Sequence, residues 1–282
     1  MEPPPDVREA VVRALEEDRA AADATSLALV PAAARAHGRI LARADGVLSG
    51  VDHATLAFQL CDPAVELDWL VGEGGRVADG DELLRCAGSA RGLLAAERTA
   101  LNFLQQLSGV ATATAELVGL LGGEVKLLDT RKTVPGLRDA QKRAVVAGGG
   151  VNHRRDLEDQ VLIKENHFAL SGLEYGAAVR RAQEASPGKV VGAEAQTEAQ
   201  AALALEAGAD YVLLDNFDFA TLPQVVARLR ARFPAAQLEV SGGVRPENAA
   251  AIRGCGVDRV SVGWITHSSP ALDLSFYLEA AG

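Results

Sequence analysis

The 282-residue sequence has little cysteine, few aromatic residues and no long hydrophobic run. Its three cysteines, Cys61, Cys86 and Cys255, lie far apart and form no CxxC pair, which argues against a disulfide framework or a zinc site and favours a reducing compartment. No stretch approaches the roughly 18 uninterrupted apolar residues of a membrane span. The N-terminus lacks an apolar segment behind a basic start, as a signal peptide would have. These absences predict a soluble, cytoplasmic protein.

Positive charge is also scarce, because 28 lysines and arginines face 38 acidic residues and leave a formal net charge of −10. Nucleic acids and anionic membranes require a broad basic surface, so neither is an expected partner. The basic residues are not interleaved with aromatic ones either, which further disfavours nucleic-acid binding. With 48% hydrophobic and 23% charged residues, the chain is typical of ordinary globular proteins.

One segment departs from this acidic background. Residues 131–155 contain a single acidic residue, Asp139, and seven basic ones: Arg131, Lys132, Arg138, Lys142, Arg143, Arg154 and Arg155. Such a segment is either a solvated helix face or part of a pocket for a small, highly charged anion. The first interpretation suits Arg138, Lys142, Arg143 and Arg155, whereas the other three flank predicted strands.

The first part of the chain predicts a small α+β domain. A helix is expected from about residue 6, and residues 38–87 contain short strand-like runs separated by glycine-rich turns. A further helix is expected in the stretch ERTALNFLQQLSGVATATAELVGLL, where apolar residues recur at helical spacing. Gly109 lies inside this helix, where glycine is unfavourable, and indicates a close packing contact.

From residue 125 the chain alternates between short apolar runs and alanine-rich helical stretches. The apolar runs are VKLLDT, QVLIKEN, KVVGAEAQ, YVLLDN, QLEVSGG and DRVSVG. Their ends at Asp129, Lys164, Glu194, Asp215, Ser241 and Gly263 are 35, 30, 21, 26 and 22 residues apart. This spacing is typical of strand–helix units with parallel strands and right-handed crossovers.

An open doubly wound sheet and a closed barrel both fit this rhythm, and polar residues at every strand end favour the barrel. A complete eight-unit barrel usually needs about 250 residues, more than remain. The predicted fold class is therefore α/β, with an N-terminal α/β sandwich domain at 1–114 and an incomplete barrel of six or seven strands at 115–268. The segment 269–282 is expected to pack back on the N-terminal domain.

Three charged residues at the ends of neighbouring strands, Lys164, Glu194 and Asp215, predict one site. Each alone could merely end a strand, but together they favour a functional cluster. The two carboxylates could hold Mg²⁺, a hard cation that takes carboxylate and phosphate oxygens, or could stabilise a cationic carbon. Lys164 would contact an anion.

Glycines follow the last two predicted strands, in VSGGVRPEN and VSVGWITHS. Gly242, Gly243 and Gly263 would let backbone N–H groups face a phosphate, and barrels commonly bind phosphate in these loops. Simple turn formation is the alternative explanation. Arg131, Lys132 and Arg154 would lie near the same end of the sheet, and His153 beside Arg154 is a candidate ligand contact. Arginine recognises carboxylates and phosphates through paired hydrogen bonds.

Other motifs are not supported. His37 and His53 have no companion ligands, and His167 and His267 lack metal-site spacing. The triple glycine at 148–150 is not a dinucleotide-binding motif, and a Walker-type GxxxxGK is missing.

The stretches ERTALNFLQQLSG, LDTRKTVPGLR, GGGVNHR, LIKENH, LLDN and SGG together resemble the quinolinate phosphoribosyltransferases, also called nicotinate-nucleotide pyrophosphorylases (carboxylating). The resemblance covers nearly the whole chain in the same order. It implies an N-terminal α/β sandwich with an incomplete barrel. It also implies a Mg²⁺-dependent pentosyltransferase of NAD biosynthesis, which converts quinolinate and phosphoribosyl pyrophosphate into nicotinate mononucleotide, pyrophosphate and CO₂.

The resemblance also implies residue roles. Arg131, His153, Arg154 and Lys164 would bind the two carboxylates of quinolinate. Arg98 would join them from a neighbouring subunit of a homodimer or larger homo-oligomer. Lys132, Glu194 and Asp215 would act on phosphoribosyl pyrophosphate and its Mg²⁺, and the backbone of Ser241, Gly242, Gly243 and Gly263 would hold the 5′-phosphate. Trp264 replaces a residue that is typically small in this family, and it would narrow the pocket or fill space.

Alternatives remain open at this point. One is a paralogue associated with molybdenum transport, against which the intact GGGVNHR and LIKENH argue. Another is a transferase for nicotinate itself, which would need fewer cations. A third is a metabolite-binding protein that retains the pocket without catalysis, against which Glu194 and Asp215 argue.

Overall fold

The computed structural model describes residues 4–281 and divides the chain into two compact units. Unit one extends to Ala115 and also includes Thr133–Gly149 and the residues from Ser268 onward. Unit two comprises Glu116–Lys132 and Gly150–His267. The segment Thr133–Gly149, which the sequence analysis assigns to the barrel, is thus grouped with unit one. The domain boundaries at 114/115 and 268/269 stay predictions, and residues 1–3 and 282 lie outside the described part of the chain.

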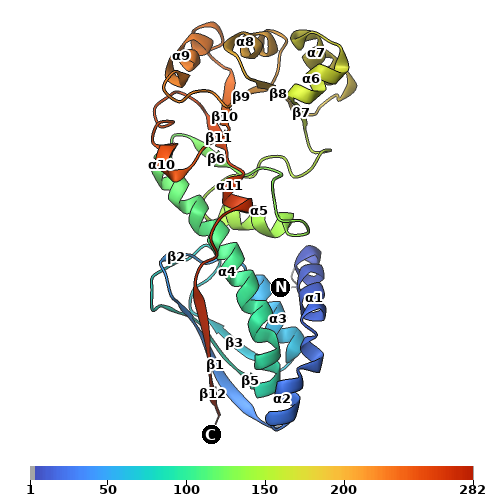
Figure 1. Ribbon diagram of the computed structural model, residues 1–282, viewed down its shortest axis with the longest axis vertical. Helices are drawn as coiled ribbons and strands as arrows, with labels where there is room; N and C mark the ends of the chain where they lie inside the picture. Colours follow the sequence, from blue (N-terminus) through green and yellow to red (C-terminus); the bar gives the residue numbers. More distant parts are fainter. Residues whose placement is uncertain (1–3, 282) are drawn as a thin grey trace. The chain divides into compact units, whose positions relative to one another are not determined.

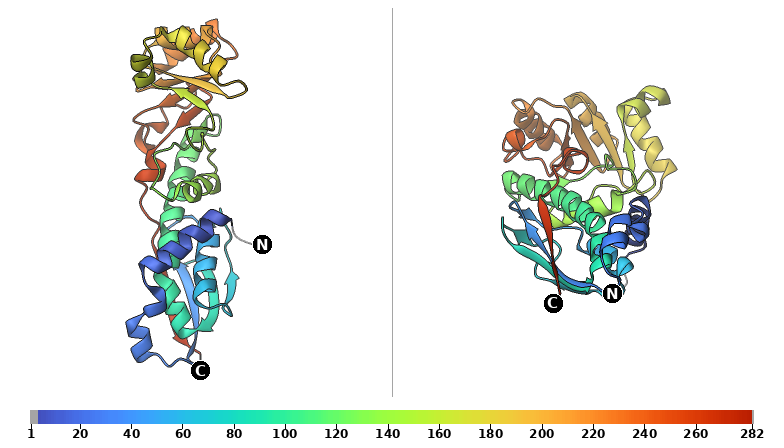
Figure 2. Two further views of the ribbon diagram at one scale, coloured as in Figure 1. Left: turned by 90° about the vertical axis from the view of Figure 1, so that its right-hand side faces the viewer. Right: turned by 60° about the horizontal axis from the view of Figure 1, so that its bottom comes forward.

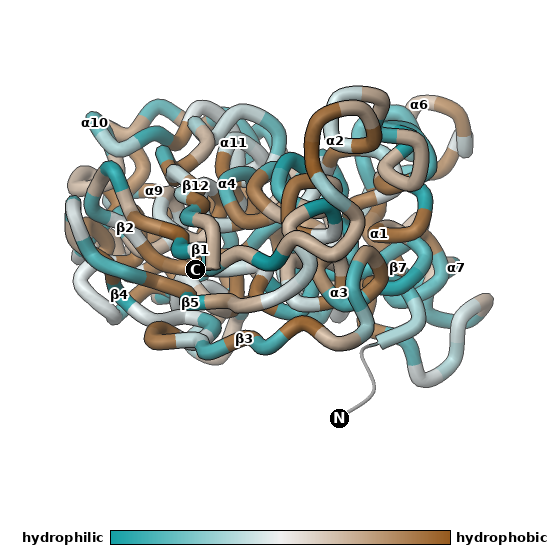
Figure 3. Tube along the Cα trace, turned by 90° about the horizontal axis from the view of Figure 1, so that it is seen from below, coloured by the Kyte–Doolittle hydropathy of each residue, from teal (hydrophilic) through white to brown (hydrophobic). Residues whose placement is uncertain are grey.

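Unit one contains a four-stranded antiparallel sheet in the order β12–β1–β5–β3. Its strands are Leu274–Ala280 (β12), Arg35–Ala42 (β1), Glu82–Ser89 (β5) and Glu66–Trp69 (β3). Exposed and buried residues alternate along β1, as expected for a strand with one face on a core. The trace near these strands changes several times between hydrophilic and hydrophobic colours (Figure 3). The last strand, β12, therefore completes a sheet begun 240 residues earlier in the chain, by pairing Ala36 with Ala280.

Helices cover one side of this sheet (Figure 1). They are α1 (Pro5–Glu17), α2 (Ala24–Leu29), α3 (Val51–Cys61) and the first part of α4 (Ala90–Leu121). The unit also contains α5 (Arg138–Ala147), which contacts α1. A short 3₁₀ helix (Ala20–Ala22) and a two-stranded sheet of β2 (Gly46–Val47) and β4 (Arg76–Val77) complete the unit. A Cβ on Gly109 would lie 2.1 Å from the carbonyl oxygen of Pro270, which confirms the predicted close packing contact.

Unit two is built on a six-stranded parallel sheet in the order β6–β11–β10–β9–β8–β7. Its strands are Lys126–Leu128 (β6), Val161–Ile163 (β7), Val191–Ala195 (β8), Tyr211–Asp215 (β9), Gln237–Ser241 (β10) and Arg259–Ser261 (β11). Consecutive strands β6 and β7 form the two edges, and Val151 adds a single parallel bridge to Leu128. An incomplete α/β barrel beside an N-terminal α/β unit is the predicted fold class, and it is confirmed.

The helices of unit two connect these strands. They are α6 (Glu165–Ser171), α7 (Tyr175–Ala185), α8 (Glu198–Glu206), α9 (Leu222–Arg232), α10 (Pro246–Ala249) and α11 (Trp264–His267). Helices α7, α8 and α9 lie along the outer side of the sheet (Figure 1, Figure 2). All five residues of β8 are buried, as expected for a strand covered on both faces.

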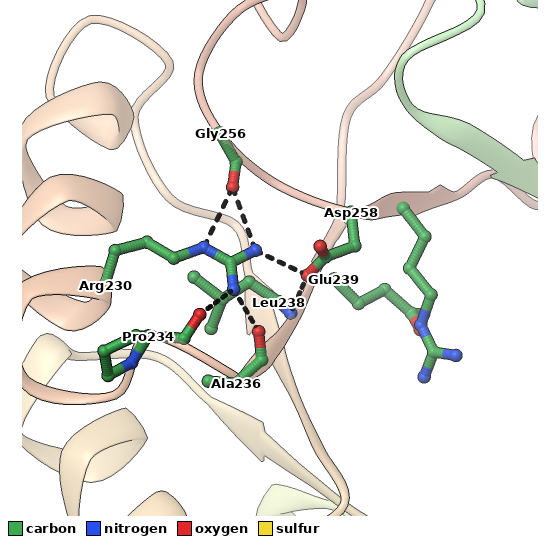
Figure 4. A network of polar contacts seen from close by, with 8 residues as sticks. Arg230, Pro234, Ala236, Leu238, Glu239, Gly256 and Asp258 are labelled. Carbon is green, nitrogen blue, oxygen red and sulfur yellow. Dashed lines mark hydrogen bonds and ion pairs between the residues drawn. The ribbon is translucent and has the colours of Figure 1, made fainter.

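The guanidinium of Arg230, at the end of α9, joins the loops that lead into β10 and β11 (Figure 4). It donates to the carbonyl oxygens of Gly256 and Ala236 and forms a 2.7 Å ion pair with Asp258. Oδ2 of Asp258 in turn accepts the N–H of Leu238 at 2.6 Å. These contacts fix the amino ends of the two strands. The carboxyl ends of the same strands take no part in them.

Within residues 4–281 no helix is long and apolar enough to cross a membrane. Cys61, Cys86 and Cys255 are free thiols.

Candidate functional site

A cavity of about 730 Å³ opens at the carboxyl ends of the parallel strands of unit two. Because parallel strands end at the same edge, residues far apart in the chain meet there. Ten of the residues selected from the sequence line it: Arg131, Lys132, His153, Arg154, Lys164, Glu194, Asp215, Ser241, Gly242 and Gly243. Further lining residues are Thr130, Leu162, Glu165, Asn166, Gln196, Leu213, Asn216 and Ser261.

Two arginines form the cationic side of this cavity. Arg154 is only 7% exposed, and its burial, followed by the positive charge of Arg131, lowers its pKa below the ordinary value. Its Nη1 donates to the carbonyl oxygen of Gln160 at 3.1 Å, which fixes the guanidinium. An anion bound between the two arginines would relieve their mutual repulsion, and a planar carboxylate suits their fork geometry.

Two carboxylates also line the cavity. Glu194 is 6% exposed, and its Oε2 lies 2.7 Å from Nζ of Lys164. Burial raises the pKa of Asp215, the nearby charge of Glu194 raises it further, and Lys164 and Lys132 oppose the shift. Asn216 donates from Nδ2 to Oδ2 of Asp215 at 2.7 Å. The repulsion between these two negatively charged side chains is thus partly offset by the neighbouring cations.

The chemistry of these donors fits a hard cation. Glu194 and Asp215 offer carboxylate oxygens of the kind that Mg²⁺ accepts together with phosphate oxygens and water. No group of three or more potential ligands (His, Cys, Asp or Glu) for a protein-held metal occurs among residues 4–281.

The loop after β10 has the backbone conformation that its glycines predict. Gly242 and Gly243 have positive φ angles of 97° and 65°, and Asn216 in the adjacent loop also has a positive φ of 56°. A Cβ on Gly242 would lie 2.1 Å from Oδ1 of Asn216, so glycine is needed for this close approach. The N–H of Asn216 donates to the carbonyl oxygen of Ser241 at 2.9 Å and joins the two loops.

Gly263 does not line the cavity, but it lies beside a residue that does. A Cβ at this position would meet Cδ of Lys132 at 2.8 Å. The carbonyl oxygen of Lys132 also accepts a 2.8 Å hydrogen bond from Oγ1 of Thr266. Trp264 is half-buried and stacks under the guanidinium of Arg245, with 5.6 Å between Cζ and the ring centroid. The tryptophan therefore packs on an arginine and is not among the residues that line the cavity.

Arg98 lies in unit one, on α4, and is not among the residues that line the unit-two cavity. Its side chain is 60% exposed and lies 3.8 Å from Glu97. It lines a separate cavity of about 510 Å³, with Arg13, Asn102 and Gln106 among the neighbours.

The sequence analysis missed several residues that shape the cavity. Asp129 and Glu239 are fully buried carboxylates, and Asn216 partners Asp215. Leu162 and Leu213 add apolar side chains to the lining of the cavity. The sequence did indicate Asp129, because it follows the first apolar run of the barrel. Glu239 lies inside its strand, where the sequence pattern does not distinguish it from other residues of the strand.

The arrangement combines three recognition elements within one unit. Its arginines suit carboxylates, its glycine loop suits a phosphate, and its paired carboxylates suit a cation or a developing positive charge. The apolar side chains of its lining suit a flat ring. Such a cavity is equipped to bring together an anionic ring compound and a phosphorylated partner.

Comparison with known proteins agrees with this geometry. The family described as "Quinolinate phosphoribosyl transferase, C-terminal domain" matches residues 110–277, and its N-terminal counterpart matches residues 23–108. A Mycobacterium leprae protein named nicotinate-nucleotide pyrophosphorylase [carboxylating] is 41% identical over 278 residues, which cover 96% of each chain. The rat protein of the same name is 36% identical over 90% of this chain and 85% of its own.

Solved structures give the same assignment. The nicotinate-nucleotide pyrophosphorylase from Francisella tularensis superimposes with a TM-score of 0.92 at 38% identity, covering 99% of this chain and 98% of the other. NadC from Streptococcus pyogenes superimposes with a TM-score of 0.93 at 35% identity, with both chains covered completely.

Proposed function

The chain belongs to the quinolinate phosphoribosyl transferase family, and we propose that it transfers the phosphoribosyl group of phosphoribosyl pyrophosphate to quinolinate. The products are nicotinate mononucleotide, pyrophosphate and CO₂, and the reaction is a pentosyl transfer in NAD biosynthesis. The observation that supports this most directly is that two arginines, two carboxylates and a glycine loop line one cavity.

Quinolinate is a flat dianion, which suits the cationic side. Arg131 and Arg154 bind its carboxylates through paired hydrogen bonds, and Lys164 adds a point charge. His153 lies directly beside Arg154 and closes this side of the cavity. Leu162 and Leu213 pack against the pyridine ring. This arrangement has more cations than a single carboxylate needs, which favours quinolinate over nicotinate as the substrate.

Phosphoribosyl pyrophosphate occupies the remaining part. The N–H groups of Gly242 and Gly243, with Ser241, hold its 5′-phosphate, because left-handed glycines turn backbone donors toward an anion. Gly263 supports this site through its contact with Lys132, whose ammonium neutralises pyrophosphate oxygens. Glu194 and Asp215 would hold Mg²⁺ together with phosphate oxygens and water, and the cation would supply neutralisation of the pyrophosphate charge.

The two carboxylates of the cavity then act electrostatically. As the bond from the anomeric carbon to pyrophosphate breaks, positive charge develops on the ribose, and Glu194 and Asp215 stabilise it. The ring nitrogen of quinolinate forms the new bond to that carbon. The resulting pyridinium accepts the electron pair left by the departing CO₂, and a proton replaces the carboxylate. None of these steps requires a covalent bond to the protein.

Arg98 contributes from a second copy of the chain in a homodimer or larger homo-oligomer. This part of the proposal is supported by the position of Arg98 on unit one, exposed and outside the unit-two cavity. The three free thiols support a reducing compartment such as the cytoplasm, although some plant relatives are named as mitochondrial or chloroplastic.

The test is release of CO₂ from carboxyl-labelled quinolinate by the purified protein, with phosphoribosyl pyrophosphate and Mg²⁺ present. Nicotinate mononucleotide should appear in equal amount, and nicotinate should not replace quinolinate. Arg131→Ala is expected to lower turnover about 100-fold. Binding of quinolinate without any product would instead support a non-catalytic metabolite-binding protein or the paralogue associated with molybdenum transport.

A further inference from the structure

A buried carboxylate lies behind the cationic side of the cavity, on β10. Glu239 is fully buried, and its Oε2 lies 2.8 Å from Nε of Arg259, the first residue of β11. The two residues are direct partners in the register of the parallel strands. Oε1 of Glu239 lies 3.4 Å from Nε2 of His153.

One ring nitrogen of His153 accepts a hydrogen bond, and the other faces Glu239. Its Nδ1 accepts the N–H of Arg154 at 2.7 Å, so this nitrogen carries no proton. A ring proton therefore belongs on Nε2, which faces Glu239. The backbone N–H of His153 also donates to Oδ1 of Asp129 at 2.8 Å. Charged groups near the ring include Glu239, Asp129, Arg154 and Arg259.

Arg259 is fixed by an aromatic ring as well as by Glu239. Its Cζ lies 4.0 Å from the ring centroid of Tyr211 on β9. Gly192 on β8 makes room for this ring, since a Cβ there would lie 2.1 Å from Cζ of Tyr211. The hydroxyl of Tyr211 donates to the side chain of Gln160 at 3.2 Å, and the carbonyl oxygen of Gln160 accepts from Arg154. A continuous series of contacts therefore links Arg259 to Arg154 through Tyr211 and Gln160.

We propose that Glu239 is a positioning residue that holds His153 as the neutral Nε2–H tautomer, while Arg259 neutralises Glu239. The imidazole thereby offers Nδ1 to the backbone of Arg154 and fixes that residue against the cavity. Pairing with Arg259 also matters electrostatically, because an unpaired carboxylate here would repel a dianion bound at Arg154. The expected effect on quinolinate binding rests on the proposed function, whereas the tautomer of His153 does not.

The direct test is the pair of ¹⁵N chemical shifts of the His153 imidazole in the folded wild-type protein at neutral pH. The inference requires a protonated Nε2 and an unprotonated Nδ1. A protonated Nδ1, or a doubly protonated ring, would overturn it without any variant. If the wild-type protein shows this tautomer but no turnover, the proposed function fails and the positioning role stands.

Variants then separate positioning from simple stability. Arg259→Met removes the cation, so Glu239 is expected to draw a second proton onto His153, and quinolinate affinity should fall about tenfold or more. The double variant Glu239→Gln, Arg259→Met removes the carboxylate too and should restore both the neutral ring and most of the affinity. Arg259→Lys keeps the charge and should leave the tautomer unchanged. An unchanged His153 ring in a folded Arg259→Met protein would contradict the proposal.

A matched control is Arg232→Met on the surface of the same unit. Arg232 pairs with Glu206 at 2.5 Å, but both side chains are about half exposed. Its removal should change neither the His153 shifts nor quinolinate affinity, because exposed ion pairs contribute little.

Discussion

Nζ of Lys164 lies 2.7 Å from Oε2 of Glu194, so a cation that follows β7 and a carboxylate of β8 form one ion pair in the cavity. The Glu194 side chain is 7% exposed and the Lys164 side chain 48%, so the lysine is the partner that can move. If Lys164 turns to a carboxylate of quinolinate, Glu194 is released toward the ribose. Binding of one substrate and stabilisation of charge on the other are therefore expected to be coupled.

Lys164→Met should raise KM for quinolinate and lower kcat/KM by roughly 10- to 100-fold, because a hydrogen bond to a charged group contributes about 1.5–3 kcal/mol and this lysine is half exposed. Glu194→Gln should lower kcat about 100-fold with a smaller effect on KM, since its role is electrostatic in the transition state. Steady-state kinetics with each substrate varied in turn distinguish the two effects. The double variant should lose less than the product of the single losses. Fully independent effects would contradict the coupling.

Arg131→Lys should behave almost like Arg131→Ala, although the charge is kept. Lysine cannot reproduce the paired hydrogen bonds that a planar carboxylate receives from guanidinium. Both variants should lower kcat/KM for quinolinate about 100-fold, as measured by CO₂ release. Arg138→Lys is a suitable control because Arg138 is not among the residues that line the cavity. Full activity of Arg131→Lys would show that Arg131 acts only through its charge.

Asp215→Asn should lower activity without lowering stability at neutral pH. The pKa of Asp215 is raised in the folded protein, so the folded state binds this proton more tightly than the unfolded chain. The ionised carboxylate therefore lowers the free energy of unfolding at neutral pH, and this penalty disappears as the pH falls through the raised pKa. The variant should lose turnover by about 100-fold or more yet keep or raise Tm at neutral pH. The gain in Tm should shrink in acid, and a lower Tm at neutral pH would contradict the assignment.

The sequence predicted the carboxyl-end residues well, for a physical reason. In parallel strands the last residue of each apolar run is carried to the same edge, so Lys164, Glu194 and Asp215 meet without any knowledge of packing. The glycines after β10 were equally informative, because positive φ angles and the contact with Asn216 demand them. The incomplete barrel followed from counting these runs against the length of the chain.

Residues inside the strands gave no such signal. Glu239 and Arg259 meet only because β10 and β11 are aligned in a particular register, which depends on the packing of the whole sheet. The grouping of Thr133–Gly149 with unit one was also missed, because α5 is amphipathic like any barrel helix and its sequence does not indicate which core it joins. The local sequence pattern predicts which residues end a strand, but it does not predict which residues of other elements they will contact.

Gly242→Ala should destabilise the protein more than Gly243→Ala. Both positions have positive φ angles, which cost a residue with a Cβ about 1–2 kcal/mol. At Gly242 the new Cβ would also displace Asn216 and remove its hydrogen bond to Asp215, whereas nothing lies within 4 Å at Gly243. Thermal unfolding measures the difference. Both variants should raise KM for phosphoribosyl pyrophosphate while quinolinate still binds, and equal Tm values would show that Asn216 yields without cost.

Arg230→Met should lower stability without changing substrate binding, because Arg230 joins the amino ends of β10 and β11, opposite the cavity (Figure 4). The substitution leaves carbonyl oxygens of Gly256 and Ala236 and the carboxylate of Asp258 without their donor, at a cost of about 1–3 kcal/mol. Tm is expected to fall by about 5 °C. Arg232→Met, two residues along the same helix, should change Tm little since its ion pair with Glu206 is exposed. KM values for both substrates should match the wild type in each variant. A raised KM in Arg230→Met would show that the amino ends of these strands govern the loops at their carboxyl ends.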